Sequence, residues 1–415
     1  MQGVSIPHPP ETVPRGKALL LPLTSIRCFL ALWVVVLHQS SPEGWLGPSL
    51  PLLPSVVFCL FRTGYLAVSV FFILSGFVLS YNYSLQTAWS SSQLVRFGIA
   101  RFARIYPAYS VGLLLIMPFV VREFLLKNFS SARLGKQIVV ALLNWTLLQS
   151  WFPRTAESWN GPGWSLSNEA FFYCCFPFVG VALWRLSRLR SLVVAAGLIW
   201  GLALIAPLLA VSIPLSGFGD VPATSLLPNA DPFWTSLVKF NPILRLPDFC
   251  IGVVLGRLYL ELRSKHSWLL GQGYFLYVPG LLLEILAIAC GKSVPYPLFH
   301  NGLLTPLHAL VILGFALGGG ILSRLLSMQP LVFLGNSSYA MYILHNPVAV
   351  LMIYFAKQVP FTEHRGLSGF VVYVLVVVCL SALVLKFVEE QMNRLLKKEL
   401  LSRFDPQPQR VISTA

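Results

Sequence analysis

Two ionisable side chains lie in the first apolar segment of the chain, where charge is costly and each charged group suggests a function. Arg27 and His38 are separated by ten residues, so on a helix with 3.6 residues per turn they share one face, about 16 Å apart along the axis. A neutral imidazole can take a proton from a hydroxyl near neutral pH. The spacing therefore predicts a general base above a guanidinium. A helix-end histidine and an arginine that reaches the headgroups would explain it equally.

A second pair of cations, Arg101 and Arg104, precedes another apolar segment. Residues three apart lie on one face of a helix, and guanidinium groups bind phosphate through hydrogen bonds of fixed geometry. The pair indicates a site for a phosphorylated ligand. The alternative is a membrane boundary whose arginines set the topology and bind anionic headgroups.

A carboxylate, Glu169, stands at the start of a later segment, within the sequence WSLSNE that begins at Trp164. Ser165 followed by an acidic residue is typical of a helix start, where the helix dipole favours negative charge. The functional hypothesis is that Glu169 orients and polarises His38 from across the bundle, as the third group of an activation set does.

Two other segments carry small or hydrogen-bonding side chains. Gly76 beside Ser75 permits close backbone approach, which physics alone assigns to helix packing before a thin linear ligand. Tyr342 and His345 are three residues apart and face one direction, with Pro347 expected to kink their helix. A buried histidine bonded to a neighbour would account for the second pair without any function.

The composition places these groups in a lipid bilayer. Hydrophobic residues make up 56% and charged residues 11% of 415 residues, and the mean hydropathy is +0.73, whereas a soluble domain carries about 25% charged residues. The seven cysteines form no metal-binding pattern, so no metal is expected. The net charge of +15 would suggest nucleic acid in a soluble protein. It has to be explained differently in a membrane protein.

A bilayer core needs about 20 apolar residues per helix. The chain offers eleven candidate segments, near residues 19–38, 65–84, 105–121, 137–151, 166–184, 192–213, 243–262, 273–290, 302–322, 331–356 and 369–388. Segment 137–151 is short and polar. If it does not cross, the short basic loops all fall on one side, as the positive-inside rule requires. We therefore expect an all-α polytopic protein of about ten transmembrane helices plus one interfacial or re-entrant helix, and no nucleic-acid partner.

The predicted organisation has three parts. Residues 1–18 and 391–415 form cytoplasmic tails, and residues 19–390 form the transmembrane domain. The start of the chain lacks the pattern of a cleavable signal. More than half of the 30 basic residues then lie on the cytoplasmic side, so the positive charge is mostly topological.

Taken together, these motifs resemble the membrane acyltransferase 3 family, which includes bacterial O-acetylases of exported and cell-surface glycans. The resemblance covers about residues 20–390. It rests on the Arg27 and His38 spacing, on FFxxSG ending at Gly76, on RxxR followed by Tyr106-Pro107, on WSLSxE ending at Glu169, and on LGxxSY leading to His345.

The resemblance implies that His38 is the catalytic residue, that Arg27 assists along the donor path and that Arg101 and Arg104 hold donor phosphates on the cytoplasmic side. It implies acyl-CoA, with acetyl-CoA the expected form, as co-substrate rather than bound cofactor, in a bacterial inner membrane. We expect His38 to deprotonate a sugar hydroxyl that attacks the thioester directly. Further expected site residues are Glu169 as a second catalytic group, Ser75 and Gly76 at the donor, and Trp164, Tyr342 and His345 in support.

Expected partners are a carbohydrate or glycolipid acceptor and membrane lipid. The tryptophans of the outer loops could stack on sugar rings or anchor the membrane interface. These residues are Trp45, Trp151, Trp159 and Trp234. Two alternatives stay open: a transporter or flippase with intramembrane His and Arg groups, and an inactive relative that assists glycan assembly.

Overall fold

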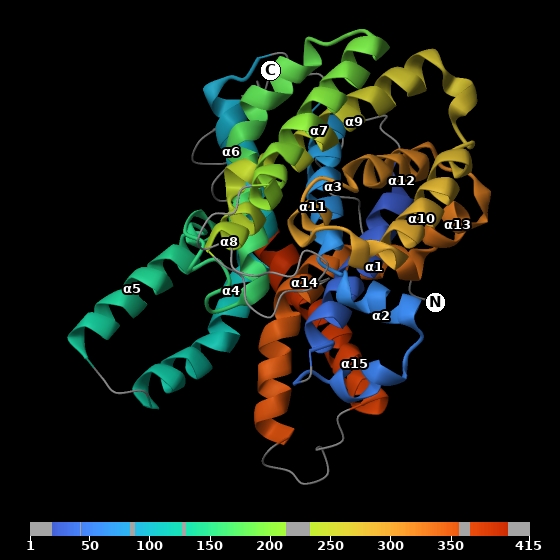
Figure 1. Ribbon diagram of the computed structural model, residues 1–415. Coiled ribbons are helices and arrows are strands. Elements are labelled where there is room, and N and C mark those ends of the chain that lie inside the picture. Colours follow the sequence, from blue (N-terminus) through green and yellow to red (C-terminus); the bar gives the residue numbers. More distant parts are fainter. Residues whose placement is uncertain are drawn as a thin grey trace, which may run out of the picture.

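The computed structural model describes residues 19–41, 43–83, 88–126, 130–212, 233–356 and 366–396. Every regular element within these ranges is helical (Figure 1), which agrees with the predicted all-α class. The N-terminal tail, most of the C-terminal tail and the greater part of the 214–242 loop lie outside the described residues.

The helices are short near the loops and long through the bundle. Their bounds are α1 (Leu21–Gln39), α2 (Ser55–Arg62), α3 (Leu66–Asn82), α4 (Ser91–Leu126), α5 (Ser131–Trp145), α6 (Trp164–Trp184), α7 (Leu189–Ser212), α8 (Phe233–Phe240), α9 (Pro242–Lys265), α10 (Tyr274–Ala289), α11 (Tyr296–His300), α12 (Thr305–Leu317), α13 (Gly320–Leu326), α14 (Gln329–Ala356) and α15 (Leu367–Val384), which continues into a π-helical turn at Leu385–Glu389.

All ten segments expected to cross the membrane are helical, but the count of ten spans is not confirmed. By length and hydropathy, seven helical stretches of the described chain could cross a bilayer, or eight if α2 and α3, which meet at a bend of 52°, form one broken span. Two predicted spans fall short for physical reasons. Helix α10 has 16 residues, and α9 carries charged groups, including the buried Arg245 and Asp248. The chain is nevertheless a multi-pass membrane protein.

The weak segment near 137–151 forms α5, which has 15 residues and does not meet the criteria for a span. Figure 1 shows α5 and the end of α4 projecting together from the side of the bundle. Apolar side chains such as Ile138 and Leu142 are exposed on this projection. Its placement as an interfacial or re-entrant helix stays a prediction.

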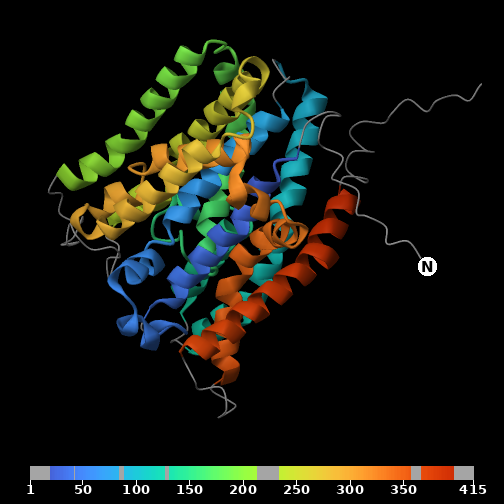
Figure 2. The same ribbon diagram turned by 90° about the vertical axis from the view of Figure 1, so that its right-hand side faces the viewer.

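Helix α1 runs through the middle of the bundle, with α14 and α15 on one side and α3 and α9 on the other (Figures 1 and 2). Its closest partner is α14. Ala31, Val34 and Val35 of α1 are almost completely buried. The helix that carries Arg27 and His38 is thus held on several sides, which fixes the direction of both side chains.

Glycines bring α3 and α9 into backbone contact. A β-carbon at Gly76 would collide with the carbonyl oxygen of Phe249 on α9, and one at Gly252 would collide with that of Ile73 on α3. Small residues at such crossings let helices in membranes pack closely. Gly76 therefore serves helix packing, the use that physics alone favoured, and it is absent from the cavity described below.

This crossing predicts a loss of stability on adding one methyl group. Gly76→Ala forces α3 away from α9, which we expect to cost about 1–3 kcal/mol, and thermal unfolding of the purified protein in detergent measures it. Gly197→Ala on α7 is the matched control, because nothing lies within 4 Å of its β-carbon and alanine favours helix. Equal melting temperatures for the two variants would contradict the assignment.

Candidate active site

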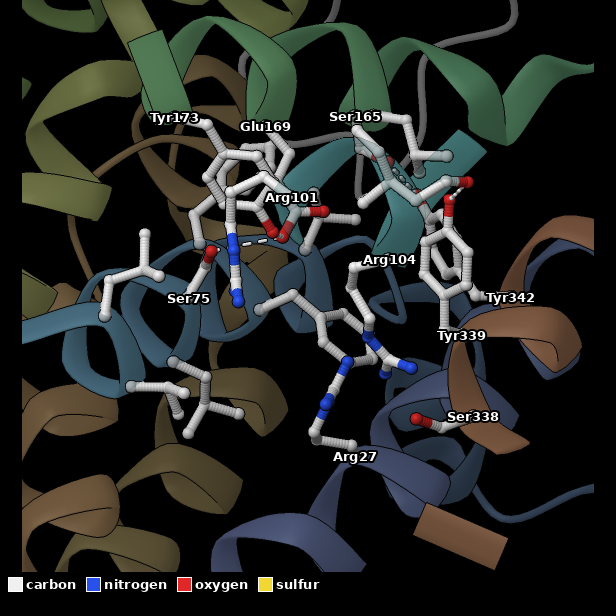
Figure 3. Close-up of a pocket in the computed structure, with 18 of the residues that line it drawn as sticks. Arg27, Ser75, Arg101, Arg104, Ser165, Glu169, Tyr173, Ser338, Tyr339 and Tyr342 are labelled. Atoms are coloured by element: carbon white, nitrogen blue, oxygen red, sulfur yellow. Dashed lines mark hydrogen bonds between the residues drawn. The ribbon is translucent and has the colours of Figure 1, made fainter. Parts of the chain in front are cut away.

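A cavity of about 220 Å³ lies between α1, α3, α4, α6 and α14. Its polar lining comes from all five helices (Figure 3). We call it the arginine cavity, and its polar residues are Thr24, Arg27, Ser75, Arg101, Arg104, Ser165, Glu169, Tyr173, Ser338, Tyr339 and Tyr342. Sequence motifs separated by more than 300 residues therefore meet around one space.

Three guanidinium groups face the arginine cavity. Figure 3 shows those of Arg27 and Arg104 directed toward one another, and that of Arg101 directed toward Ser75 and Glu169. Arg104 also donates to the buried carboxylate of Glu389 at 3.1 Å. Cations thus outnumber carboxylates by three to two in this part of the described chain, so the cavity is suited to an anionic group.

Arg101 lies against aromatic rings. Its guanidinium carbon is 5.9 Å from the ring centre of Phe97 and 5.7 Å from that of Tyr173. The Nε atom is buried without a hydrogen-bond partner among the described residues. Buried donors are normally paired, so a ligand oxygen in the cavity would complete the environment of this side chain.

Glu169 is held by its neighbours rather than by His38. Its Oε1 accepts hydrogen bonds from Ser75 Oγ at 3.1 Å and from the hydroxyl of Tyr173 one helical turn away. No contact between Glu169 and His38 occurs in the described part of the chain. The expectation that Glu169 orients His38 is therefore corrected: the second turn of α6 directs the carboxylate into the arginine cavity, whereas His38 is not part of the cavity lining.

Tyr342 lines the arginine cavity and also contacts residues outside it. Its hydroxyl shares a 2.8 Å hydrogen bond with Ser165, and its ring meets Phe71 edge to face at 5.8 Å. The backbone carbonyl of the same residue lies 2.7 Å from Nδ1 of His345. Tyr342 thus joins the cavity wall to the histidines beyond it.

His38 and His345 form a contacting pair. Nδ1 of His38 lies 3.3 Å from Nε2 of His345, and the ring centres are 4.9 Å apart. His345 is completely buried on α14, whereas His38 is exposed near the end of α1. His38 therefore presents an accessible imidazole on a buried partner.

Three of the remaining predicted residues are tryptophans that pack against other aromatic rings. Trp164 is buried edge to face between Phe72 and Phe240, outside the cavity lining. Trp45 is 5% exposed and stacks on Tyr373, so it is closed to a sugar ring. Trp151 is half-buried against Phe171.

Trp159 and Trp234 keep more accessible surface. Trp159 is half-buried and adopts a positive φ of 59°, a backbone conformation that non-glycine residues rarely take outside functional or tightly packed sites. Trp234 is 37% exposed at the start of α8. These two stay candidates for contact with an acceptor.

Sequence reasoning missed Glu389, the buried partner of Arg104. It occupies the last position of the π-helical turn that follows α15, and such turns are frequent at functional sites. The available signal was an acidic residue at the end of a strongly apolar segment, because any charged residue within the membrane suggests a functional site. Tyr173, also in the lining, carried no distinct signal, whereas Tyr339 belongs to the LGxxSY motif but was not named as a site residue. No cluster of three or more His, Cys, Asp or Glu side chains that could hold a metal occurs in the described ranges.

Comparison with known proteins adds independent findings. A family model described as an acyltransferase domain matches residues 23–386. Acyltransferase MdmB from Streptomyces mycarofaciens is 28% identical over 335 residues, which cover 78% of this chain and 77% of that protein. The peptidoglycan O-acetyltransferase OatA of Listeria monocytogenes is 26% identical over 309 residues, 70% of this chain. The match spans 46% of OatA. No solved structure matches the chain.

Proposed function

The chain belongs to the membrane acyltransferase 3 family, and from this premise we propose that it moves an acyl group from acyl-CoA to a hydroxyl of a sugar or glycan. Acetyl-CoA is the donor we expect. The acceptor class follows the chemistry named for OatA, peptidoglycan O-acetylation. The proposal assigns donor binding to the arginine cavity and deprotonation of the acceptor to His38.

The donor end of the proposal rests on charge and shape. Coenzyme A carries several phosphate charges on a long, thin chain that ends in the thioester. The proposal assigns the phosphates to Arg101 and Arg104, which line the cavity together with Arg27. The apolar residues of the cavity, such as Leu23 and Val68, suit the thin chain that leads from the phosphates to the acyl group.

In the proposed reaction the acceptor hydroxyl gives its proton to His38 as its oxygen attacks the thioester carbonyl. The C–O bond of the new ester forms, the C–S bond of the thioester breaks, and the imidazolium gives the proton to the departing thiolate. Each proton lost by the acceptor appears on coenzyme A, so no metal or redox partner is needed. A base positioned in this way contributes about 10²- to 10⁴-fold to the rate.

One observation carries the proposal: Tyr342 lines the arginine cavity, and the backbone carbonyl of Tyr342 contacts the histidine that in turn contacts His38. An anion-binding end and an accessible imidazole are thus joined through one residue of α14. The arginines proposed to bind the donor line the cavity, and the histidine proposed to accept the proton lies outside it.

The proposal is tested by release of free thiol. We expect purified protein in lipid nanodiscs to release coenzyme A from acetyl-CoA when a polysaccharide or peptidoglycan fragment is present, with a matching gain of acetyl mass on the acceptor. A transporter would move its substrate without consuming acetyl-CoA. Thiol release that does not depend on any acceptor, or none with a panel of glycans and acyl-CoA lengths, would contradict the proposal.

A further inference from the structure

The two histidines are held by groups whose hydrogen-bonding roles are fixed. Nδ1 of His345 faces the carbonyl oxygen of Tyr342 at 2.7 Å, and Nδ1 of His38 faces that of Val34 at 2.9 Å. A carbonyl oxygen can only accept. Both Nδ1 atoms must therefore carry a proton if these contacts are hydrogen bonds, which leaves only the two Nε2 atoms to be assigned.

The assignment of His345 follows from its burial. Its side chain is 0% exposed, and a buried imidazole is most stable when it is neutral. A neutral ring with a proton on Nδ1 has a lone pair on Nε2. That lone pair is directed at Nδ1 of His38, 3.3 Å away. The proton on His38 Nδ1 is thus shared between two acceptors, one from its own helix and one from α14.

We propose that His345 is the positioning residue of His38: it holds the tautomer in which Nε2 of His38 is the free base and stabilises the imidazolium that forms. This inference rests on the proposed function and deepens it. When Nε2 of His38 takes the acceptor's proton, the Nδ1–H becomes a charged donor, and its hydrogen bond to His345 strengthens. His345 then acts as the orienting third group that Glu169 was expected to be.

The surroundings of His345 hold it in place. Its backbone carbonyl accepts from the hydroxyl of Tyr373 at 2.8 Å. Pro347 lacks an N–H and so leaves the carbonyl of Ile343 without its helical partner, and Asn160 donates to that carbonyl at 2.9 Å. The part of α14 around Pro347 is therefore bonded to α15 and to the loop before α6, which restricts the freedom of the imidazole.

Two substitutions separate positioning from packing. The side-chain amide of glutamine reaches about as far as Nε2 of histidine, so His345→Gln can still offer an acceptor oxygen to His38. The amide of asparagine reaches only as far as Nδ1, so His345→Asn can keep the hydrogen bond to Tyr342 and lose the one to His38. Both variants introduce a polar amide into the same buried place, so each controls for the other.

We expect His345→Asn to lower kcat for acetyl transfer by about 10- to 100-fold, as loss of a group that orients a histidine commonly does, with KM for acetyl-CoA unchanged. His345→Gln should keep most of the activity. Equal losses in the two variants, an unchanged His345→Asn, or a change in KM alone would overturn the inference. Absence of transfer by the wild-type protein would instead count against the proposed function.

A measurement on the wild-type protein covers the case in which the variants fail to fold. Nitrogen-15 chemical shifts distinguish a protonated from an unprotonated ring nitrogen, and the signals of His38 are identified by their loss in His38→Asn. We expect a protonated Nδ1 and an unprotonated Nε2 for neutral His38. The opposite tautomer would overturn the inference without any assay of activity.

Discussion

Replacing His38 with alanine is expected to lower acyl transfer by about 10²- to 10⁴-fold, the contribution of a positioned general base, while KM for acyl-CoA changes little. The reason is the separation of the two ends of the site. His38 lies outside the arginine cavity, in contact with His345 and the carbonyl of Val34. Its loss removes the proton acceptor and leaves the donor-binding side chains in place.

The measurement is coenzyme A release by purified protein in nanodiscs at saturating acceptor. His266→Ala is the matched control, because His266 is an exposed histidine at the far end of α9. The exposure of His38 means that its truncation should not unfold the protein, and a thermal melt checks this. Transfer at the wild-type rate by a folded His38→Ala variant would eliminate His38 as the base.

Helical periodicity predicted the parts of the site that depend on one helix. The spacing of Arg27 and His38, and that of Arg101 and Arg104, indicated shared faces, and both arginines of the second pair line the cavity with Arg27. The period of an α-helix fixes which side chains share a face before any other helix is known. Expectations of this kind depend only on local geometry.

The contacts between side chains on different helices could not be predicted in the same way. Glu169 was expected beside His38, but it faces Ser75 and Tyr173, because α6 crosses the bundle at the level of the arginines. His345 took the place beside His38 instead. The sequence spacing of 307 residues between the two histidines carries no information on their contact, which arises from the packing of α1 along α14.

The count of ten spans is not confirmed for a related reason. Mean hydropathy counts every side chain of a segment, whether the side chain faces lipid or protein. The charges near the start of α9 are enclosed by protein, because Arg245 pairs with Asp248 at 3.2 Å and donates to Ser69 on α3. A charge that is buried within the protein and paired with an opposite charge does not face the lipid. Composition alone cannot show whether the charges of a helix face lipid or protein. Segment 243–262 was therefore predicted as a span, although α9 carries too many charged residues to count as one by composition.

Arg101→Gln is expected to raise KM for acetyl-CoA by about 10- to 100-fold, because a hydrogen bond to a charged group contributes about 1.5–3 kcal/mol. kcat at saturating donor should change little. Arg101 is the sharper target of the pair, since Arg104 has a buried carboxylate partner in Glu389 and its loss would leave that charge unpaired. The double variant Arg104→Gln with Glu389→Gln removes both charges together and should also raise KM.

A donor without phosphates makes the prediction specific. A short acetyl thioester that ends before the nucleotide cannot contact Arg101 through phosphate, so its low activity should be equal in wild type and in Arg101→Gln. Arg188→Gln, at an exposed arginine in the turn before α7, controls for the loss of one positive charge on the protein. If Arg101→Gln weakened both donors alike, the guanidinium would be supporting the cavity through Phe97 and Tyr173, and donor phosphates would have to bind elsewhere.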